Sequence, residues 1–254
     1  MDSVSASGRV AGKIFIVTGG ASGLGAADAR LLAQHGATVV ITDTQEDAGR
    51  ELAASTEGIY FLPQDVCDEQ RWNEIVAEVE ARFGGLDGLV NNAGIVGYAD
   101  VEQCSLDMFR KHLAVMAEGT FLGCKAAIPA MVRRGGGAIV NMASTAAVKG
   151  IGTIPAYSAA KGAIAALTRS VAVHCQEKRY NIRVNTVIPG GHDTPMTRSA
   201  FANMDPDDPG LAHAISEGMG KPEDVANLVL YLLSDEARRV TGASMVIDHG
   251  ETIR

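Results

Sequence analysis

Short apolar runs rich in β-branched residues recur along the chain between turn residues, and longer stretches of helical character separate them. The short runs have the length and composition of buried strands. They are Ile14–Thr18, Thr38–Thr42, Ile59–Leu62, Gly88–Asn91, Ala138–Asn141, Arg183–Ile188 and Ser244–Asp248. The intervening stretches predict helices over Leu24–His35, Glu46–Ala54, Glu69–Arg82, Leu106–Arg134, Tyr157–Gln176 and Pro222–Ser234.

Alternation of strand and helix predicts an α/β protein with a doubly wound, seven-stranded parallel sheet and helices on both faces. The length of 254 residues suits one such domain better than two small ones. We expect residues 1–10 to form a flexible tail and residues 11–254 to form a single domain. The segment of residues 189–220 contains Pro195, Pro206 and Pro209 and is expected to be an irregular, mobile lid beside the functional site.

The formal net charge of −8, without any basic run interleaved with aromatic residues, argues against a nucleic-acid surface. We therefore expect small-molecule partners. Residues 1–9 lack the apolar core of a signal peptide, and no uninterrupted apolar segment approaches the roughly 18 residues of a membrane span. A cytoplasmic protein with no membrane partner is expected.

The cysteines form no Cys-x-x-Cys pair, so neither a metal site nor a disulfide is predicted for Cys67, Cys104, Cys124 and Cys175.

The first predicted strand is followed by a glycine-rich turn, Thr18–Gly25, that leads directly into a helix. Glycines in such a turn let backbone N–H groups and the helix N-terminus approach a pyrophosphate. The second strand ends at Asp43, where a carboxylate can accept hydrogen bonds from both hydroxyl groups of an adenosine ribose. The alternative interpretation of Asp43 is a solvated aspartate in a turn. A carboxylate repels a 2′-phosphate, and neither Ser22 nor Thr44 is basic, so the pattern favours NAD over NADP.

Tyr157 and Lys161 are four residues apart in a predicted helix, so both side chains lie on one helical face. A free phenol has a pKa of about 10, and a neighbouring ammonium group favours the phenolate. The pair is therefore suited to proton transfer. An ordinary helix face with a half-buried ring and an extended lysine has the same spacing. The glycine-rich turn and Asp43 favour the catalytic interpretation.

The chain resembles the short-chain dehydrogenase/reductase family, in its compact form, over nearly all of Gly12–Gly250. The matching motifs are the Thr-Gly-x-x-x-Gly-x-Gly spacing of Thr18–Gly25, Asp65-Val66, Asn91-Asn92-Ala93-Gly94, Asn141-Met142-Ala143-Ser144, Tyr157-Ser158-Ala159-Ala160-Lys161, Arg183-Val184-Asn185 and Pro189-Gly190 through Thr194-Pro195-Met196. The resemblance implies a Rossmann-type fold and reversible hydride transfer between NAD and a secondary alcohol or ketone.

The resemblance also implies a role for each matching residue. Ser144 would hydrogen-bond the substrate oxygen, Tyr157 would act as general acid or base, and Lys161 would hold the nicotinamide ribose and lower the tyrosine pKa. Asp65 and Val66 would flank the adenine, Asn91 the adenine-side ribose, and Ile188 and Thr194 the carboxamide. The residues expected to contact the cofactor are Gly19, Ser22, Gly23, Leu24, Gly25, Asp43, Asp65, Val66, Asn91, Ala93, Gly94, Tyr157, Lys161, Pro189, Gly190 and Thr194.

Met116 departs from the family pattern, because the family places an asparagine there. In relatives this residue helps to hold a water molecule that links the lysine to solvent, largely through its main-chain carbonyl beside a helix irregularity. Met116 keeps the carbonyl, but a thioether does not replace the hydrogen bonds of an amide. We expect an active enzyme with an altered proton relay.

Residues near the expected pocket rim are largely apolar, which suits an aliphatic, alicyclic or steroid-sized alcohol. They are Ile95, Val96, Tyr98, Val148, Ile151, Ile154, Met196, Phe201 and Met204. Each of them has an ordinary core position as its alternative. His192 is a candidate to hydrogen-bond the substrate, with a solvated histidine as the alternative.

Three functions compete. The leading hypothesis is an NAD-dependent secondary-alcohol dehydrogenase, and the second is an NAD-binding sensor or scaffold with weak or no turnover, motivated by Met116. A sugar-nucleotide epimerase or dehydratase ranks third, because its larger C-terminal substrate region has no counterpart here. By resemblance, small residues around Ala159–Ala166 predict helix pairing between subunits, with a homotetramer expected first and a dimer next.

Overall fold

A computed structural model of the chain describes residues 8–202 and 219–253. Its described residues form a seven-stranded sheet in the order β3-β2-β1-β4-β5-β6-β7, in which every neighbouring pair is parallel. The strands are β1 (Ile14–Thr18), β2 (Thr38–Asp43), β3 (Ile59–Pro63), β4 (Gly88–Asn91), β5 (Gly137–Met142), β6 (Ile182–Pro189) and β7 (Ser244–Ile247). This order confirms the predicted doubly wound sheet.

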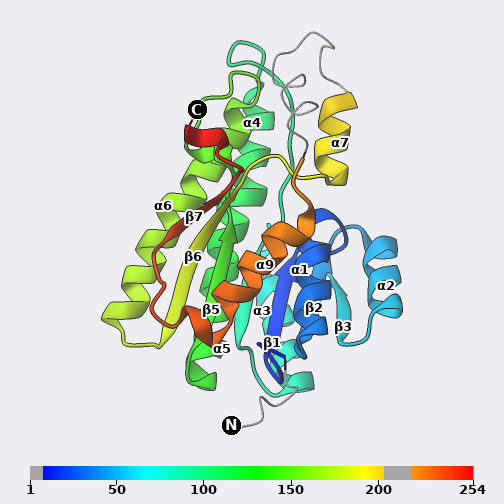
Figure 1. The fold of residues 1–254 in the computed structure, drawn as a ribbon, viewed down its shortest axis with the longest axis vertical. Coiled ribbons are helices and arrows are strands. Elements are labelled where there is room, and N and C mark those ends of the chain that lie inside the picture. Colours follow the sequence, from blue (N-terminus) through cyan, green and yellow to red (C-terminus); the bar gives the residue numbers. More distant parts are fainter. Residues whose placement is uncertain (1–7, 203–218, 254) are drawn as a thin grey trace.

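Helices cover both faces of the sheet (Figure 1). One face carries α1 (Gly23–Gln34), α2 (Glu46–Ser55) and α9 (Pro222–Leu233). The other face carries α3 (Glu69–Phe83), α5 (Gly119–Arg134) and α6 (Pro155–Glu177). Short 3-10 turns η2 (Thr145–Ala147), η3 (Asp235–Ala237) and η4 (Glu251–Ile253) lie between or after these elements.

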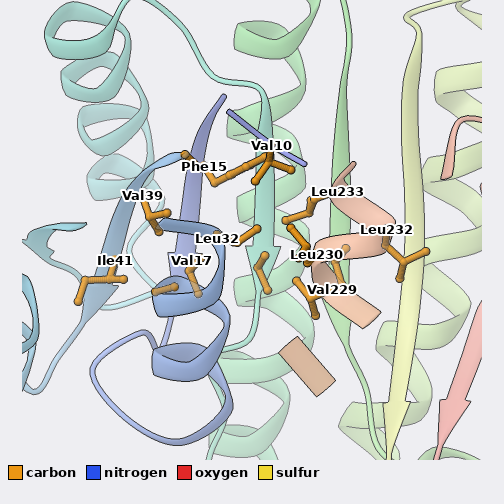
Figure 2. Close-up of a cluster of buried hydrophobic side chains, with 14 of the residues drawn as sticks. Val10, Phe15, Val17, Leu32, Val39, Ile41, Val229, Leu230, Leu232 and Leu233 are labelled. Atoms are coloured by element: carbon orange, nitrogen blue, oxygen red, sulfur yellow. The ribbon is translucent and has the colours of Figure 1, made fainter. Parts of the chain in front are cut away.

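The core consists of one apolar layer on each face of the sheet. In the layer beneath α1 and α9, Phe15, Val17 and Leu32 pack with Val229 and Leu230, as Figure 2 shows. All five are at most 1% exposed. Burial of each large apolar side chain contributes about 1.5–3 kcal/mol, so the two layers hold the strand ends in fixed positions.

The predicted helix over Leu106–Arg134 is three consecutive elements in the structure: α4 (Leu106–His112), the π-helix η1 (Leu113–Glu118) and α5. The whole run is apolar enough to cross a membrane by composition, with a mean hydropathy of 1.2 over 18 residues. Glu118 and Lys125 interrupt its apolar part, so the run is not an uninterrupted apolar segment. The run packs against α3 and α6, which identifies it as a core helix.

The flexible tail expected for residues 1–10 ends earlier in the structure. Val10 is fully buried, and Arg9 forms an ion pair with Glu236 at 2.7 Å, so these two residues belong to the packed domain. Residues 1–7 lie outside the described residues.

The expected irregular segment of residues 189–220 contains a helix, α7 (Pro195–Ala202), at its start. Thr194 caps this helix, because its hydroxyl oxygen accepts the N–H of Thr197 at 3.2 Å. Pro195 at the first helical position has the backbone angle that a helix needs there. The remainder of the expected lid, residues 203–218, lies outside the described residues.

Candidate active site

A cavity of about 460 Å³ opens where the strands end. Its lining includes Gly19 after β1, Asp43 at the end of β2, Asp65 after β3, Ser144 after β5 and Pro189 at the end of β6. The strand order reverses at β1, which has β2 on one side and β4 on the other. Ligands of open α/β sheets bind at this reversal, and the volume is typical of a small-molecule site.

The glycine-rich turn forms one wall of the cavity through Gly19, Ser22, Gly23 and Leu24. Gly19 has a φ of +62°, and a Cβ atom there would lie 2.8 Å from the Cα atom of Ala93. Only glycine fits both the backbone angle and this close approach. Helix α1 begins at Gly23, so its free N–H groups lie at the cavity wall and suit a phosphate.

Gly25 does not line the described cavity, although it was expected to contact the cofactor. A Cβ atom at this position would collide with the carbonyl oxygen of Gly19 and with the side chain of Asn92. Gly25 therefore permits close packing between α1 and the turn. Its role in the site is indirect.

Asp43 lines the cavity beside the glycine-rich turn and is 9% exposed. Its carboxylate accepts the N–H of Ala21 at 3.1 Å and the N–H of Gln45 at 3.0 Å. These bonds hold the side chain at the end of β2, where its remaining lone pairs suit two vicinal hydroxyl groups. Asp65 and Val66 line the cavity beyond it, as expected.

Asn91, which was expected near a ribose, is not among the residues that line the cavity. Its amide donates to Asn141 Oδ1 at 2.8 Å inside the protein. Asn92 lines the cavity instead, and its amide donates to Thr18 O at 3.0 Å and to Gly19 O at 3.1 Å. Successive side chains on extended backbone point to opposite faces, so only one of the two asparagines reaches the site. Ala93 and Gly94 line the cavity as expected.

Ser144, Tyr157 and Lys161 meet at the other end of the cavity. Ser144 follows β5 and forms the N-cap of η2, accepting the N–H of Ala146 at 3.2 Å. Helix α6 begins at Pro155 and carries Tyr157 and Lys161 on one face. The Ser144 side chain lies close enough to the Tyr157 hydroxyl to lower its pKa. The Lys161 Nζ atom lies 5.5 Å from the centre of the Tyr157 ring and donates to Met142 O at 2.7 Å.

Burial dominates the electrostatics of this group. It raises the pKa of Tyr157 to about 12, and the Ser144 side chain opposes part of that rise. It lowers the pKa of Lys161 to about 7. Both shifts disfavour the charged form, as desolvation does. The four-residue spacing alone predicted a lowered tyrosine pKa, and the structure has the opposite direction because both groups are buried.

Met116 lies close to this group and is fully buried in η1. A Cβ atom built on Gly94 would lie 3.5 Å from the Met116 sulfur and 3.7 Å from Lys161 Nζ, so both side chains approach the same point. The thioether thus occupies space beside the lysine. The π-helix at Met116 is the helix irregularity that the resemblance implied.

The expected substrate residues divide into two groups. Ile95, His192 and Met196 line the cavity, while Val96 and Ile151 lie outside its described lining. His192 is 6% exposed, so the solvated alternative is wrong. Its Nδ1 atom bonds to Gly190 O at 3.0 Å, and its backbone bridges to Gly220. The position of Met204 and the side chain of Phe201 lie outside the description.

Other apolar rim residues, Tyr98, Val148 and Ile154, are also outside the described lining. Pro189, Gly190 and Thr194 line the cavity as expected, and Ile188 does not. Within residues 8–202 and 219–253, no group of three His, Cys, Asp or Glu side chains is placed to hold a metal ion.

Several residues that line the cavity were not predicted as site residues from the sequence. Lys111 and Val115 come from the α4–η1 run, and Gln64 and Met142 come from strand ends. Met142 belongs to the matched motif Asn141-Met142-Ala143-Ser144, and Gln64 directly precedes the motif Asp65-Val66, so their neighbours in the chain were the available signal. Lys111 and Val115 reach the cavity only because the helix crosses the sheet.

Comparison with known proteins gives a consistent result. The model of a protein family described as enoyl-(acyl carrier protein) reductase matches residues 19–252. The trans-4-hydroxycyclohexanecarboxylate dehydrogenase of Sinomonas cyclohexanicum is 40% identical over 97% of this chain and 95% of its own length. The 3-beta-hydroxysteroid dehydrogenase of Comamonas testosteroni is 40% identical over 95% of this chain and 96% of its own length.

A third relative differs in its stated cofactor. The NADP-dependent (R)-specific alcohol dehydrogenase of Lentilactobacillus kefiri is 38% identical over 96% of this chain and 98% of its own length. Among solved structures, levodione reductase superposes with a TM-score of 0.87 at 33% identity, covering 96% of this chain and 99% of that one. The names of these relatives describe them as dehydrogenases or reductases.

Proposed function

Because the chain belongs to the short-chain dehydrogenase/reductase family, we propose that it is an NAD-dependent oxidoreductase that interconverts an apolar, alicyclic or steroid-like secondary alcohol and its ketone. Relatives that are alcohol and hydroxysteroid dehydrogenases support the broader activity on secondary alcohols. The observation that carries the finer proposal is one cavity that is lined both by Asp43 and by the group Ser144, Tyr157 and Lys161.

The residues of the cavity fit a dinucleotide. The glycine wall and the N-terminus of α1 suit a pyrophosphate, and the Asp43 carboxylate suits ribose hydroxyl groups. Thr194 lies beside Gly23, because a Cβ atom at Gly23 would be 3.4 Å from the Thr194 Cβ atom. When bound, a nicotinamide ring supplies the acceptor or donor of the hydride at the carbinol carbon. The apolar side chains of Ile95 and Met196 leave the adjoining space suited to a hydrocarbon ring.

The protein's own residues would transfer the proton. Ser144 orients the substrate oxygen toward the Tyr157 hydroxyl, which donates a proton in ketone reduction and accepts one in alcohol oxidation. A tyrosine pKa of about 12 keeps the phenol protonated at neutral pH, which is the form needed for ketone reduction. Alcohol oxidation needs the phenolate and is expected to accelerate as the pH rises.

The first test is turnover with a panel of cyclic, linear and steroidal secondary alcohols, with NAD⁺ and NADP⁺ offered separately and NADH or NADPH absorbance followed. NAD⁺-dependent oxidation of a cyclic member supports the proposal. Cofactor binding without turnover across the panel would contradict it and favour the alternative, a sensor or scaffold, which the methionine at position 116 motivates.

The cofactor preference predicts a switch at the end of β2. The double variant Asp43→Ser with Thr44→Arg is expected to raise KM for NAD⁺ about 10- to 100-fold, since hydrogen bonds to a charged carboxylate contribute about 1.5–3 kcal/mol. It is also expected to lower KM for NADP⁺, because Arg attracts the 2′-phosphate. Steady-state kinetics with both cofactors measure this. Asp47→Asn, which removes an exposed acid on α2, is the matched control. Wild-type preference for NADP⁺ would refute the assignment.

The methionine beside Lys161 predicts a mild result. Met116→Asn is expected to leave kcat unchanged or to raise it, because an amide restores hydrogen bonds for a water near the lysine. Stopped-flow kinetics compare it with Met116→Leu, which keeps an apolar side chain of similar volume. A collapse of activity in Met116→Asn alone would show that the thioether has a positive role.

We further propose a cytoplasmic homotetramer. Phe121 on α5 is 48% exposed and Val173 on α6 is 51% exposed, so these helices present apolar side chains that subunit pairing would cover. Light scattering after gel filtration is expected to give about four times the chain mass of 26.5 kDa. A monomer would contradict the proposal, and a dimer would limit the pairing to one interface.

A further inference from the structure

A chain of hydrogen bonds lies buried beneath the candidate active site. Asn91 donates to Asn141 Oδ1 at 2.8 Å, Asn141 Nδ2 donates to Thr168 Oγ1 at 2.9 Å, and the Thr168 hydroxyl donates to Ile164 O at 2.8 Å. Asn141 and Thr168 are both 0% exposed. Each of these groups has a partner within the protein, so the network is satisfied although it lies away from water.

The central bond joins the two elements that carry the catalytic residues. Asn141 is on β5, immediately before Met142 and three residues before Ser144. Thr168 is on α6, seven residues after Lys161. Seven residues are close to two helical turns, so Thr168 and Lys161 face β5 from the same side of α6, about 10 Å apart along the helix axis.

Two hydrogen bonds therefore connect β5 to one face of α6. The first, at the active site, joins Lys161 Nζ to Met142 O at 2.7 Å. The second, two helical turns further along α6, joins Thr168 to Asn141 at 2.9 Å. Apolar packing is tolerant of small slides and rotations, whereas a buried hydrogen bond has a narrow range of distance and angle. Two such bonds along one helix face restrict both the axial position and the rotation of α6.

The neighbouring strand offers a contrast. Thr186 on β6 is paired in register with Asn141, and its buried hydroxyl has no hydrogen-bond partner among the described residues. A threonine in this part of the core is thus compatible with an unpaired hydroxyl. The Thr168 hydroxyl differs because it connects β5 to α6.

We propose that Asn141 and Thr168 are positioning residues for the active site, and that their hydrogen bond sets the register between Ser144 on the β5 side and Tyr157 and Lys161 on α6. The inference rests on the proposed function, since that function assigns proton transfer to the residues being positioned. A displacement of about 1 Å in a catalytic group costs about 100-fold in rate, so a small slide of α6 is enough to matter.

Thr168→Val tests the proposal, because it removes the hydroxyl group and keeps the side-chain volume. We expect kcat to fall at least tenfold with KM for cofactor and alcohol changed less than threefold. Thr168→Ser keeps the hydroxyl and is expected to restore kcat to within about threefold of wild type. Thr186→Val removes the unpaired hydroxyl on β6 and is the matched control, with wild-type kcat expected.

A second readout is independent of turnover. Tyrosine labelled with ¹³C at the ring carbon that bears the hydroxyl reports on its hydrogen bond, and Tyr157→Phe identifies the Tyr157 signal. In Thr168→Val that signal is expected to shift because the position of Tyr157 relative to Ser144 changes, while Thr168→Ser and Thr186→Val leave it in place. If Thr168→Val does not fold, the double variant Asn141→Leu with Thr168→Val removes both partners and is expected to show the same shift.

The outcomes separate this inference from the proposed function. Wild-type turnover with an unchanged Tyr157 signal and unchanged kcat in Thr168→Val would overturn the positioning role and leave the function intact. Equal loss in Thr168→Ser and Thr168→Val would also overturn it, because the hydroxyl would not be the responsible group. Absence of wild-type turnover would overturn the function, and the Tyr157 signal would still decide the positioning role.

Discussion

Tyr157→Phe is expected to lower kcat for alcohol oxidation and for ketone reduction by a factor of about 10²–10⁴, the usual contribution of a positioned general acid or base. The substitution removes one hydroxyl group and keeps the ring, which packs beside Lys161. The cavity wall formed by the glycine-rich turn and Asp43 is unchanged, so cofactor affinity is expected to remain within a few-fold of wild type.

Steady-state rates and cofactor titration by fluorescence measure the two quantities separately. Tyr60→Phe removes a hydroxyl group from a tyrosine on β3 that is 39% exposed, and it is the matched control with activity retained. Wild-type kcat in Tyr157→Phe would remove the assignment of Tyr157 as the acid and base. Loss of cofactor binding together with kcat would point to a structural effect instead.

Lys161→Met is expected to abolish most activity and, at the same time, to change how stability depends on pH. Burial lowers the lysine pKa to about 7 in the folded protein, whereas an unfolded chain has a lysine pKa of about 10.4. Between these values the unfolded state binds more protons, so the free energy of unfolding of the wild type rises with pH. The methionine variant lacks this contribution.

The sign and size of the difference follow from this linkage. At pH 7 the buried lysine costs the wild type on the order of 4 kcal/mol, and the cost declines toward zero near pH 10.5. Loss of the bond to Met142 O costs the variant about 1–3 kcal/mol at every pH. The variant is therefore expected to be the more stable protein at pH 7, with an advantage that shrinks by about 1 kcal/mol per pH unit from pH 7 to pH 9.

Urea unfolding of both proteins at several pH values measures this trend. Lys125→Met removes an exposed ammonium group that pairs with Glu69 and controls for the loss of a surface charge. A constant difference between wild type and Lys161→Met across this range would contradict the buried, deprotonating lysine. Retained kcat in the variant would contradict its role beside Tyr157.

The strand and glycine assignments were predictable because they depend on short stretches of chain. Seven short apolar runs alternating with helices leave few alternatives to a parallel sheet, and the structure confirms the sheet, although its edge strand β7 is partly exposed. Position 19 requires glycine because its φ is positive and the backbone of Ala93 lies close to it. The glycine pattern of the turn can therefore be recognised in the sequence. The Thr194–Pro195 helix start carries equally local signals, yet the prolines of this segment indicated an irregular loop.

Side-chain direction and burial were not predictable in the same way. Asn91 and Asn92 are adjacent and chemically identical, and only their place at the end of β4 decides that Asn92 lines the cavity while Asn91 joins the buried network. Tyr157 and Lys161 share a helix face by spacing alone. The pKa of Tyr157 is raised to about 12 and that of Lys161 is lowered to about 7, because the packed domain removes both side chains from water.

By itself the sequence determined the doubly wound sheet, the glycine wall, the acidic residue at the end of β2 and the catalytic candidates, because each depends on residues close together in the chain. Only the tertiary structure decided which of these residues share a cavity, which carbonyl holds Lys161 and which threonine connects β5 to α6. Those features join residues that are far apart in sequence, and packing between the sheet and its helices brings them together. Burial then sets the protonation chemistry that spacing on one helix does not determine.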